Sequence, residues 1–411
     1  SIAWAPNLKT AFLKTGKLPN PRYAPVATDD ARAEILAAKA LIDGDDVISE
    51  WLGRLSDSLM STVGLIETRG TPEFLTHSTA LYGQPTRLML DRQTTVLDLA
   101  QHMDQLLVGL DIEHLVLEGS EKYLTDVQFA RQLRTRLKRH FKTDAPDVII
   151  SASVGSKAAA SSKRIRIRQG ASFTEGDVDQ LLHHEALVHT ATALNGKAQT
   201  EFPILGRAHP GTTEIQEGLA VFAEIITGSM DPRRFKRLSG RVLAIQMAVE
   251  GADFKDVYEF FLERDDDPSQ SYENARRIFR GGVITGGAPF TKDMVYLNGL
   301  LRVHNFMRTV VRMGRADLIR VLFVGKMDIE DVPALAHLAA HNRLKTPQFM
   351  PPWVKDLRFL VSYLAYSSFL NRVKMPGFQT YYEEELKGVP NVWSLMLNDR
   401  IDQSGEDIIN E

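Results

Sequence analysis

The sequence contains no cysteine among its 411 residues. A disulfide framework, a thiol nucleophile and a cysteine-ligated zinc site are therefore excluded. No apolar run approaches the roughly 18 residues of a membrane-spanning helix, so we expect no membrane span. Ser1 to Lys9 also lack the charged-then-apolar order of a signal peptide. The absence of cysteine does not choose a compartment, and we assign the protein to the cytoplasm.

Neither sign of charge is in large excess. The chain has 49 lysines and arginines against 52 acidic residues, with a net charge of -3 and a pI near 6.4. Such a balance gives no general attraction to nucleic acid or to anionic membranes, and basic residues are not interleaved with aromatic ones. Hydrophobic residues make up 44% of the chain, which is enough for a sizeable core.

Apolar spacing gives a coarse outline of the fold. Residues 1–25 are expected to form an extended arm, and residues 29–63 have helical periodicity. Residues 148–151 and 164–168 are the best strand candidates, joined as a hairpin by a loop of small residues. The second strand alternates arginine and isoleucine, which predicts a half-exposed strand near a sheet edge, where it could hold an extended peptide. Almost all of the chain beyond residue 210 has a helical pattern.

The strongest functional signal is a cluster of histidines and glutamates. His184 and Glu185 are followed by His189, and Glu217 lies on a later predicted helix. Zinc binds imidazole and carboxylate ligands, and a catalytic zinc keeps three protein ligands and one water. We therefore expect His184, His189 and Glu217 to bind one Zn²⁺ per chain, with Glu185 as the general base and proton shuttle.

The spacing of the two histidines is unusual, because His184 and His189 are five residues apart. On an ideal α-helix they would point about 140° apart. A π-bulge absorbs one extra residue, and such bulges are frequent at functional sites. We predict a wide helical turn between them. The alternative ligand His183 is six residues from His189, too far for one bulge to align the pair.

Capping signals place these residues on two helices. Thr174 and Asp177 predict the start of the first helix, and Asn195-Gly196 predict its end. Thr213 and Gln216 predict the start of the second helix, with Glu217 in its first turns and Gly228 at its end.

On the second helix, Glu217 shares a face with Glu224. Glu224 is expected to accept a hydrogen bond from a ligand histidine. Glu214 is an alternative to Glu217 as the third ligand.

Four strings together resemble one protein family. They are His184-Glu185 with His189, Asn195-Gly196 with Gln199, Gln216-Glu217-Gly218-Leu219-Ala220, and Phe290-Thr291-Lys292-Asp293 with Tyr296-Leu297. The sequence resembles the family of unknown-function proteins named for its QEGLA motif, of the flavohaemoglobin expression-modulating type. Animal relatives of that family include microtubule-associated tyrosine carboxypeptidases, which remove the C-terminal tyrosine of α-tubulin. The resemblance covers most of the chain from about residue 30 and does not assign a substrate.

The resemblance implies an α+β, mainly helical, zincin-like metallopeptidase with a small sheet and an HExxxH active-site helix. Residues 1–78 would be an N-terminal arm and helical layer, and residues 79–411 the zinc metallopeptidase domain, unless the two form one compact unit. The substrate would be a peptide or protein C-terminus.

A carboxypeptidase also needs a cation for the terminal carboxylate and a donor for the oxyanion. Arg280 and Lys292 are the candidates for binding the carboxylate, and Lys292 and Tyr296 are the candidates for catalysis. Arg207 is a weaker choice for the cation.

Three other interpretations remain open at this point. The chain could be a metal-binding regulatory or interaction protein without turnover, an aminopeptidase or endopeptidase with the same zinc, or a helical scaffold without metal. The intact Glu185 favours an enzyme, because a structural metal site has no use for a base.

Overall fold

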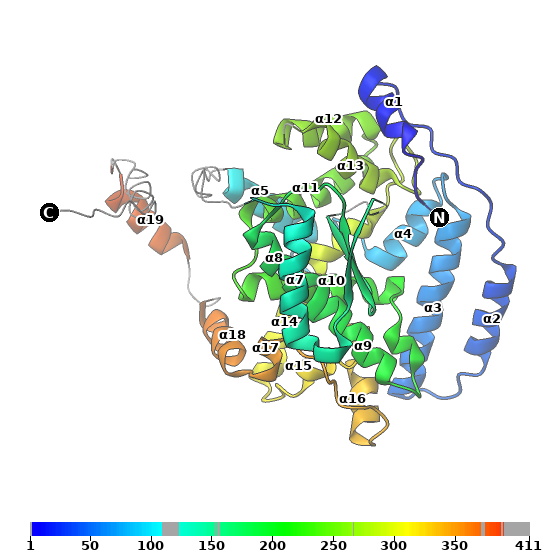
Figure 1. Cartoon of the computed structure of the whole chain (residues 1–411), viewed down its shortest axis with the longest axis vertical. Helices are drawn as coiled ribbons and strands as arrows, with labels where there is room; N and C mark the ends of the chain where they lie inside the picture. The colour runs from blue at the N-terminus through cyan, green and yellow to red at the C-terminus, as the bar shows by residue number, and fades with distance from the viewer. Residues whose placement is uncertain are drawn as a thin grey trace.

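The computed structural model describes residues 2–108, 123–152, 154, 157–265, 267–370, 375–387 and 389. Helices dominate these residues, and the strands are short (Figure 1). None of the helices in the described ranges combines the length and apolarity that crossing a membrane requires. The elements, with 3₁₀- and π-helices marked η, are α1 (Asn7–Thr15), α2 (Asp29–Ala40), α3 (Val47–Glu67), α4 (Phe74–Tyr82), α5 (Val96–Val108), β1 (Tyr123–Leu124), α7 (Asp126–Phe141), η1 (Lys142–Asp144), β2 (Asp147–Ser151), β3 (Ala158–Ala160), β4 (Arg164–Arg168), β5 (Phe173–Thr174), α8 (Glu175–Leu181), η2 (Leu182–Thr190), α9 (Ala191–Ala198), η3 (Pro203–Gly206), α10 (Pro210–Ile226), α11 (Pro232–Val249), α12 (Phe254–Asp265), α13 (Pro268–Phe279), η4 (Thr291–Met294), α14 (Val295–Arg312), α15 (Leu318–Val321), η5 (Ile329–Asp331), α16 (Val332–Ala340), α17 (Pro352–Lys355), α18 (Arg358–Leu370) and α19 (Met375–Glu385).

The sequence had predicted an extended N-terminal arm over residues 1–25, and this prediction is wrong in part. Helix α1 interrupts it, and Phe12 on that helix is buried. The Phe12 ring packs edge-to-face on Phe254 at 5.0 Å and lies 5.6 Å from Tyr272. Buried aromatic contacts of this kind stabilise beyond the area they remove from water. The segment is therefore anchored on α12 and α13, while the division at residue 78 stays a prediction.

The three-stranded sheet has the order β2-β4-β3. β2 runs parallel to β4, and β3 runs antiparallel to it. The predicted hairpin between β2 and β4 is therefore wrong, because the short alanine strand β3 lies between them in sequence. β4 is also the central strand and not an edge. Its arginine–isoleucine alternation reports which face is buried: Ile165 and Ile167 are fully buried in a cluster with α7.

Helices α10 and α14 cross at two glycines. A Cβ on Gly218 would lie 2.2 Å from the backbone carbonyl carbon of Gly299, and a Cβ on Gly299 would lie 2.1 Å from the Glu214 carbonyl oxygen. Backbone atoms cannot move aside as a flexible side chain can. The absence of side chains at both positions therefore allows the helix bearing Glu217 to approach α14 this closely.

We predict that Gly218→Ala lowers the free energy of unfolding by about 1–3 kcal/mol, as overpacking in a core does. Urea unfolding followed by circular dichroism would measure this change. Gly53→Ala is the matched control, because Gly53 lies within α3 and has no atom within 4 Å of the added Cβ. The control should be neutral or slightly stabilising. Equal stability of the Gly218→Ala protein and the unmodified chain would show that the helices can separate without cost.

Candidate metal centre

The segment that carries the two histidines is a π-helix. Thr174 caps α8 through a reciprocal capping box with Asp177, as predicted. The chain continues without a break into η2, whose nine residues are π-helical. A π-helix pairs residues i and i+5, which is the separation of His184 and His189. The predicted wide turn is therefore present, and it brings both imidazoles to one side of the helix.

His184, His189 and Glu217 meet at one point. Their ligand atoms all lie within 4.8 Å of one another. His184 Nε2 is 3.4 Å and His189 Nε2 is 3.6 Å from Glu217 Oε2, and the two rings are perpendicular. Two ligand atoms of a tetrahedral zinc are also about 3.4 Å apart, given zinc–ligand distances of about 2.1 Å. Glu217 Oε2 is buried and accepts no hydrogen bond. This donor set could hold a metal ion.

A buried ion pair lies directly behind His184. The Nδ1 atom of His184 is 2.6 Å from Glu224 Oε1, and the Glu224 side chain is fully buried. Arg234 on α11 donates to both oxygens of the same carboxylate. Such a partner fixes the tautomer and the orientation of the imidazole, so that Nε2 faces Glu217. The structure thus places Glu224 where the sequence had predicted it.

The pKa values of His184 and Glu217 are shifted in opposite directions. Burial alone would lower the pKa of His184, but Glu217 and Glu224 outweigh it and raise the pKa to about 10. Burial would raise the pKa of Glu217, but the two imidazoles hold it well below its usual range. Both shifts are those of a buried ion pair between an imidazole and a carboxylate.

We predict that Glu224→Gln weakens metal binding by about 10–100-fold, because the ligand imidazole loses its charged partner. Competition with a coloured chelator would measure the affinity. Glu214→Gln is the matched control on the same helix, because the Glu214 carboxylate bonds Arg302 and does not belong to the cluster. A Glu224→Gln protein that binds metal as tightly as the control would contradict the role given to Glu224.

Glu185 belongs to the π-helix, and its side chain reaches the edge strand β3. Its Oε2 accepts a hydrogen bond of 3.1 Å from the backbone N–H of Ala160. The side chain is half-buried, and its charge acts on the neighbouring His184. β3 thus holds the carboxylate of Glu185 next to the cluster. The sheet edge beside the cluster belongs to β3, and not to β4 as predicted.

The start of α10 differs from the prediction. The helix begins at Pro210, with His209 as the residue before it, so Glu217 lies in its third turn and not in its first turns. Proline is favoured at the first helical position because its missing N–H has no partner there in any helix. The prediction that Thr213 and Gln216 start the helix is therefore wrong. The position within the helix lets Glu217 face inward.

Gln216 lies at the crossing of three segments. Its Oε1 accepts hydrogen bonds from Thr192 Oγ1 at 2.8 Å and from Lys326 Nζ at 2.9 Å. Burial lowers the pKa of Lys326 to about 8, while the charges of Glu217 and Glu185 oppose that shift. Lys326 is thus a nearly buried cation beside the two carboxylates. No motif in the sequence indicated it.

The sequence had predicted that the helix ends at Asn195-Gly196. This prediction is wrong, because α9 continues to Ala198. Asn195 is buried, and its side chain bonds the backbone of Phe323 and Phe349. A Cβ on Gly196 would lie 1.9 Å from the Leu205 carbonyl oxygen. Both residues therefore serve tertiary contacts. The Asn195 amide forms hydrogen bonds with backbone groups of distant loops, and the lack of a side chain at Gly196 lets the backbone of Leu205 approach closely.

A cluster of cations lies on the far side of Glu217. Arg277 makes a bidentate pair with Asp293, at 2.6 and 2.8 Å, and Arg241 lies 3.5 Å from the same carboxylate. The Lys292 side chain has no hydrogen-bond partner within the described part of the chain. The Nε atom of Arg280 is buried and unpartnered, and its guanidinium lies 5.4 Å from the Phe290 ring. Arg277 and Arg241 thus share the carboxylate of Asp293, and the charges of Glu217 and Asp293 both act on Lys292.

The structure brings Lys292 and Tyr296 to this same region. Lys292 lies in η4 and Tyr296 near the start of α14, and the charge of Glu217 acts on both. Burial lowers the pKa of Lys292, an effect that Glu217 opposes. Burial and Glu217 raise the pKa of Tyr296 to about 12, so its hydroxyl keeps its proton at neutral pH. The Arg280 charge acts on Lys292, which places these two candidates together as well.

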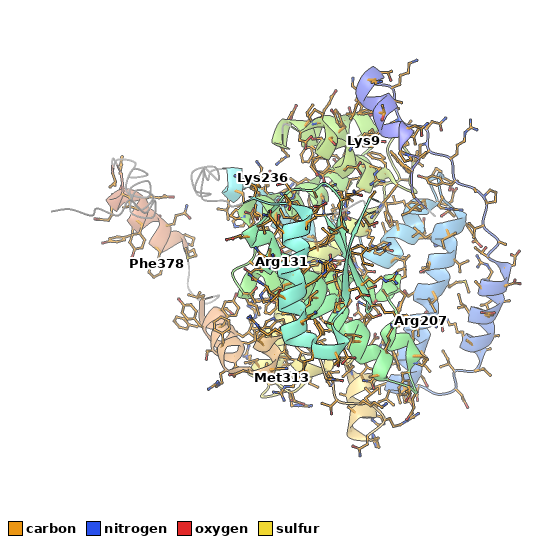
Figure 2. All side chains as sticks on the ribbon, in the orientation of Figure 1. Lys9, Arg131, Arg207, Lys236, Met313 and Phe378 are labelled. Carbon is orange, nitrogen blue, oxygen red and sulfur yellow. The ribbon has the colours of Figure 1, made fainter. Side chains whose placement is uncertain are left out.

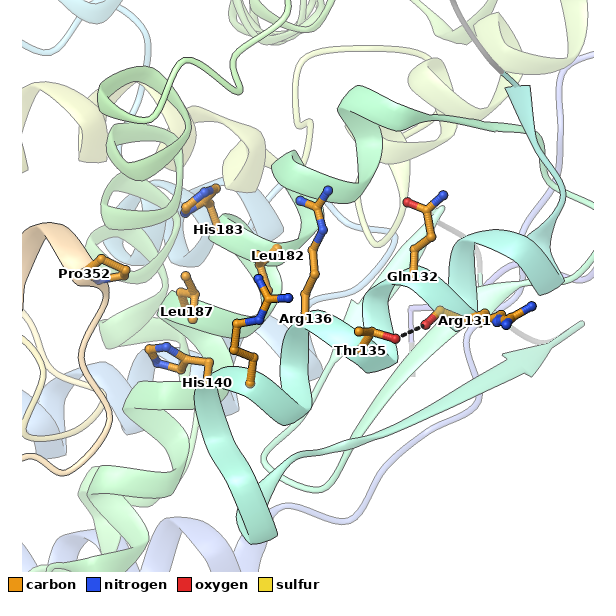
Figure 3. A pocket seen from close by; sticks show the side chains of 10 residues that line it. Arg131, Gln132, Thr135, Arg136, His140, Leu182, His183, Leu187 and Pro352 are labelled. Atoms are coloured by element: carbon orange, nitrogen blue, oxygen red, sulfur yellow. Dashed lines mark hydrogen bonds between the residues drawn. The ribbon is translucent and has the colours of Figure 1, made fainter.

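The structure separates the alternatives from the cluster. Glu214 Oε1 accepts a hydrogen bond of 2.7 Å from Arg302. Arg207 is exposed in the segment after η3 (Figure 2). His183 lies beside α7, on another side of the π-helix (Figure 3).

Comparison with known proteins identifies the family. A sequence model of the microtubule-associated tyrosine carboxypeptidases matches residues 10–372. The chain belongs to this family. The mouse protein named "Putative tyrosine carboxypeptidase MATCAP2" is 31% identical over 98 residues, which are 24% of this chain and 17% of the mouse protein. The chain thus matches less than a fifth of that relative's length.

One solved structure is also similar. The structure titled "The crystal structure of the putative lipoprotein from Colwellia psychrerythraea" aligns with a TM-score of 0.45 at 13% identity, over 72% of this chain and 61% of the other.

Proposed function

We propose that this chain is a zinc-dependent carboxypeptidase that removes residues from the C-terminus of a peptide or protein in the cytoplasm. The observation that carries the proposal is the meeting of His184, His189 and Glu217 beside Glu185. Membership in a family of tyrosine carboxypeptidases supports the same reaction. The proposed fold is that of a zincin-like peptidase whose active-site helix is the π-helix η2.

His184, His189 and Glu217 would hold the zinc. Bound zinc supplies a Lewis acid that polarises the scissile carbonyl and lowers the pKa of water. Glu185 would accept the proton of the attacking water and deliver it to the leaving amine. The Ala160 N–H keeps one oxygen of Glu185 in place and leaves the other free for this transfer.

The cation cluster would recognise the substrate's terminal carboxylate. Lys292 and Arg280 are half-buried, and each has donors that the described residues leave unpaired. A carboxylate bound there would replace the solvent that both cations lose, and would offset the excess of charge around Asp293. Tyr296, whose raised pKa keeps it protonated, would donate a hydrogen bond to the developing oxyanion.

Two measurements test this proposal. Elemental analysis of purified protein should find one zinc per chain. A set of peptides with varied C-termini, including tyrosine, should lose residues from that end only, as read by mass spectrometry. Chelation should stop the reaction, and added zinc should restore it. Bound zinc without any cleavage would favour a regulatory metal protein, and trimming from the N-terminus would favour an aminopeptidase.

A further inference from the structure

The turn after α13 begins at Arg280, and its backbone is held from two sides. Gly281 donates its N–H to the hydroxyl oxygen of Tyr23 at 2.7 Å, and its carbonyl oxygen accepts a hydrogen bond of 2.9 Å from the Gly70 N–H. Gly281 has a φ of +87°, a conformation that residues with a side chain rarely adopt. Partners from two distant parts of the chain therefore fix the backbone directly after Arg280.

The partner of the Gly281 N–H belongs to the N-terminal segment. Tyr23 also accepts a hydrogen bond of 3.0 Å from Trp4 Nε1, and Trp4 itself is buried. The N-terminus lies beside α4 in Figure 1, and a Cβ on Gly281 would be 3.1 Å from Ile2 Cγ2. The beginning and the end of this segment thus meet at Gly281, and the Tyr23 hydroxyl joins them.

The Tyr23 hydroxyl is the acceptor of both hydrogen bonds. A hydroxyl has two acceptor lone pairs, whereas a backbone N–H and an indole N–H can only donate. Phenylalanine at this position would remove the acceptor from Gly281 and from Trp4 at the same time. A donor that loses its partner in a buried place costs more free energy than the hydrogen bond had contributed. The turn at Gly281 should therefore shift when the hydroxyl is removed.

Such a shift would reach Arg280 directly. The guanidinium of Arg280 lies 5.4 Å from the Phe290 ring, and its Nε atom is buried without a hydrogen-bond partner. In the described part of the chain, no carboxylate forms an ion pair with Arg280. The backbone at the turn and the Phe290 ring are thus what place this side chain. Recognition of a carboxylate by an arginine depends on such placement, because a displacement of about 1 Å can cost about 10²-fold.

We propose that Tyr23 is a positioning residue for substrate recognition: through the N–H of Gly281, it holds Arg280 where that side chain can bind the terminal carboxylate. The inference rests on the proposed function, in which Arg280 takes part in binding that carboxylate. The N-terminal segment is then a part of the substrate site, although Tyr23 itself does not touch the substrate. No spacing in the sequence connects residue 23 with residue 280.

Two probe peptides test the inference without any cleavage. They are N-acetyl-Ala-Ala-Tyr with a free C-terminal carboxylate and the same peptide with a C-terminal amide. Isothermal titration calorimetry would measure both in the zinc-loaded Glu185→Gln protein, the parent for these measurements. We expect the parent to bind the acid about tenfold more tightly than the amide, because charge-assisted hydrogen bonds are the stronger ones. Adding Tyr23→Phe should weaken binding of the acid by about fivefold or more and leave binding of the amide unchanged.

Tyr272→Phe is the matched control. The Tyr272 ring lies 6.4 Å from the Trp4 ring, but its hydroxyl has no hydrogen-bond partner among the described residues. This variant should bind both peptides as the parent does. Arg280→Gln should remove the preference for the acid, and Tyr23→Phe added to it should cause no further loss, because Tyr23 acts through Arg280.

An equal loss of affinity for the acid and the amide in Tyr23→Phe would show a merely structural role and overturn the inference. Circular dichroism would establish that the variant is folded. Trp4→Phe is a second, milder variant that leaves Tyr23 in place and removes one of its two donors, and the same selective loss is expected there to a smaller extent.

The two proposals fail in different ways. A parent that binds both peptides equally would overturn the proposed function together with this inference. A preference for the acid that disappears in Arg280→Gln but survives in Tyr23→Phe and in Trp4→Phe would overturn this inference alone.

Discussion

Replacing Glu185 with glutamine should lower kcat/KM for peptide cleavage by about 10²–10⁴-fold while leaving one zinc bound per chain. Glutamine keeps the size of the side chain and can still accept the Ala160 N–H, so the local structure should be preserved. It cannot accept a proton at neutral pH. The expected loss therefore isolates the proton transfer from metal binding.

The measurement is the initial rate of release of the C-terminal residue, together with elemental analysis of the same sample. Glu175→Gln is the matched control, because Glu175 is exposed in the first turn of α8, the helix that leads into η2. It should leave the rate and the zinc content unchanged. Full activity of the Glu185→Gln protein would assign the base to another residue, and loss of zinc would show that Glu185 supports the metal instead.

Asp293→Ala should lower the free energy of unfolding by about 3–5 kcal/mol, because it leaves two buried arginines without their carboxylate. Asp293 is 2% exposed and pairs with Arg277, while Arg241 lies 3.5 Å away. Burial and Arg277 already lower the pKa of Arg241 to about 10. Without Asp293 these like charges would face each other in a mostly buried site.

The pH dependence of stability should show the same pair. Burial alone would raise the pKa of Asp293, but Arg277 and Arg241 outweigh it and hold the pKa well below its usual range. A depressed carboxyl pKa stabilises the folded state above the unfolded value of about 3.9, and this contribution is lost as the pH falls further. Urea unfolding between pH 7 and pH 3 would measure it. The unmodified chain should lose more stability below pH 4 than Asp293→Ala does.

Asp317→Ala is the control for these measurements. Asp317 pairs with Arg315 at the surface, where both side chains are more than half exposed. Exposed pairs contribute little to stability. If Asp293→Ala were no less stable than this control, the cation cluster would not depend on its one carboxylate.

The two histidines of the candidate metal centre could be predicted from the sequence because their geometry is local. His184, Glu185 and His189 lie within six residues, and the excess residue between the histidines required a wide turn on any helix. Glu217 and Glu224 were found by their shared helix face, although the helix begins earlier than its capping signal suggested. Helical periodicity is sufficient for such residues, because neighbours along the helix fix where each side chain points.

The remaining contacts join segments that are distant in sequence. Arg234, Lys326 and Asp293 come from three segments that are distant in sequence, and no spacing rule connects them to His184 or Glu217. The sheet shows the same limit. Alternation in residues 164–168 identified the buried face correctly, but it contains no information on which strands lie on either side.

The π-helix also sets the orientation of everything that follows it. An α-helix turns by about 100° for each residue, so one additional residue in η2 rotates all later side chains by that angle unless the wide turn absorbs it. Asn195 and Gln199, which hold the loops at Phe349 and Lys345, lie downstream of this turn. The wide turn therefore fixes how His184 and His189 are oriented relative to Asn195 and Gln199. The candidate metal ligands and the side chains that bond the loops can then lie on different sides of one continuous helical segment.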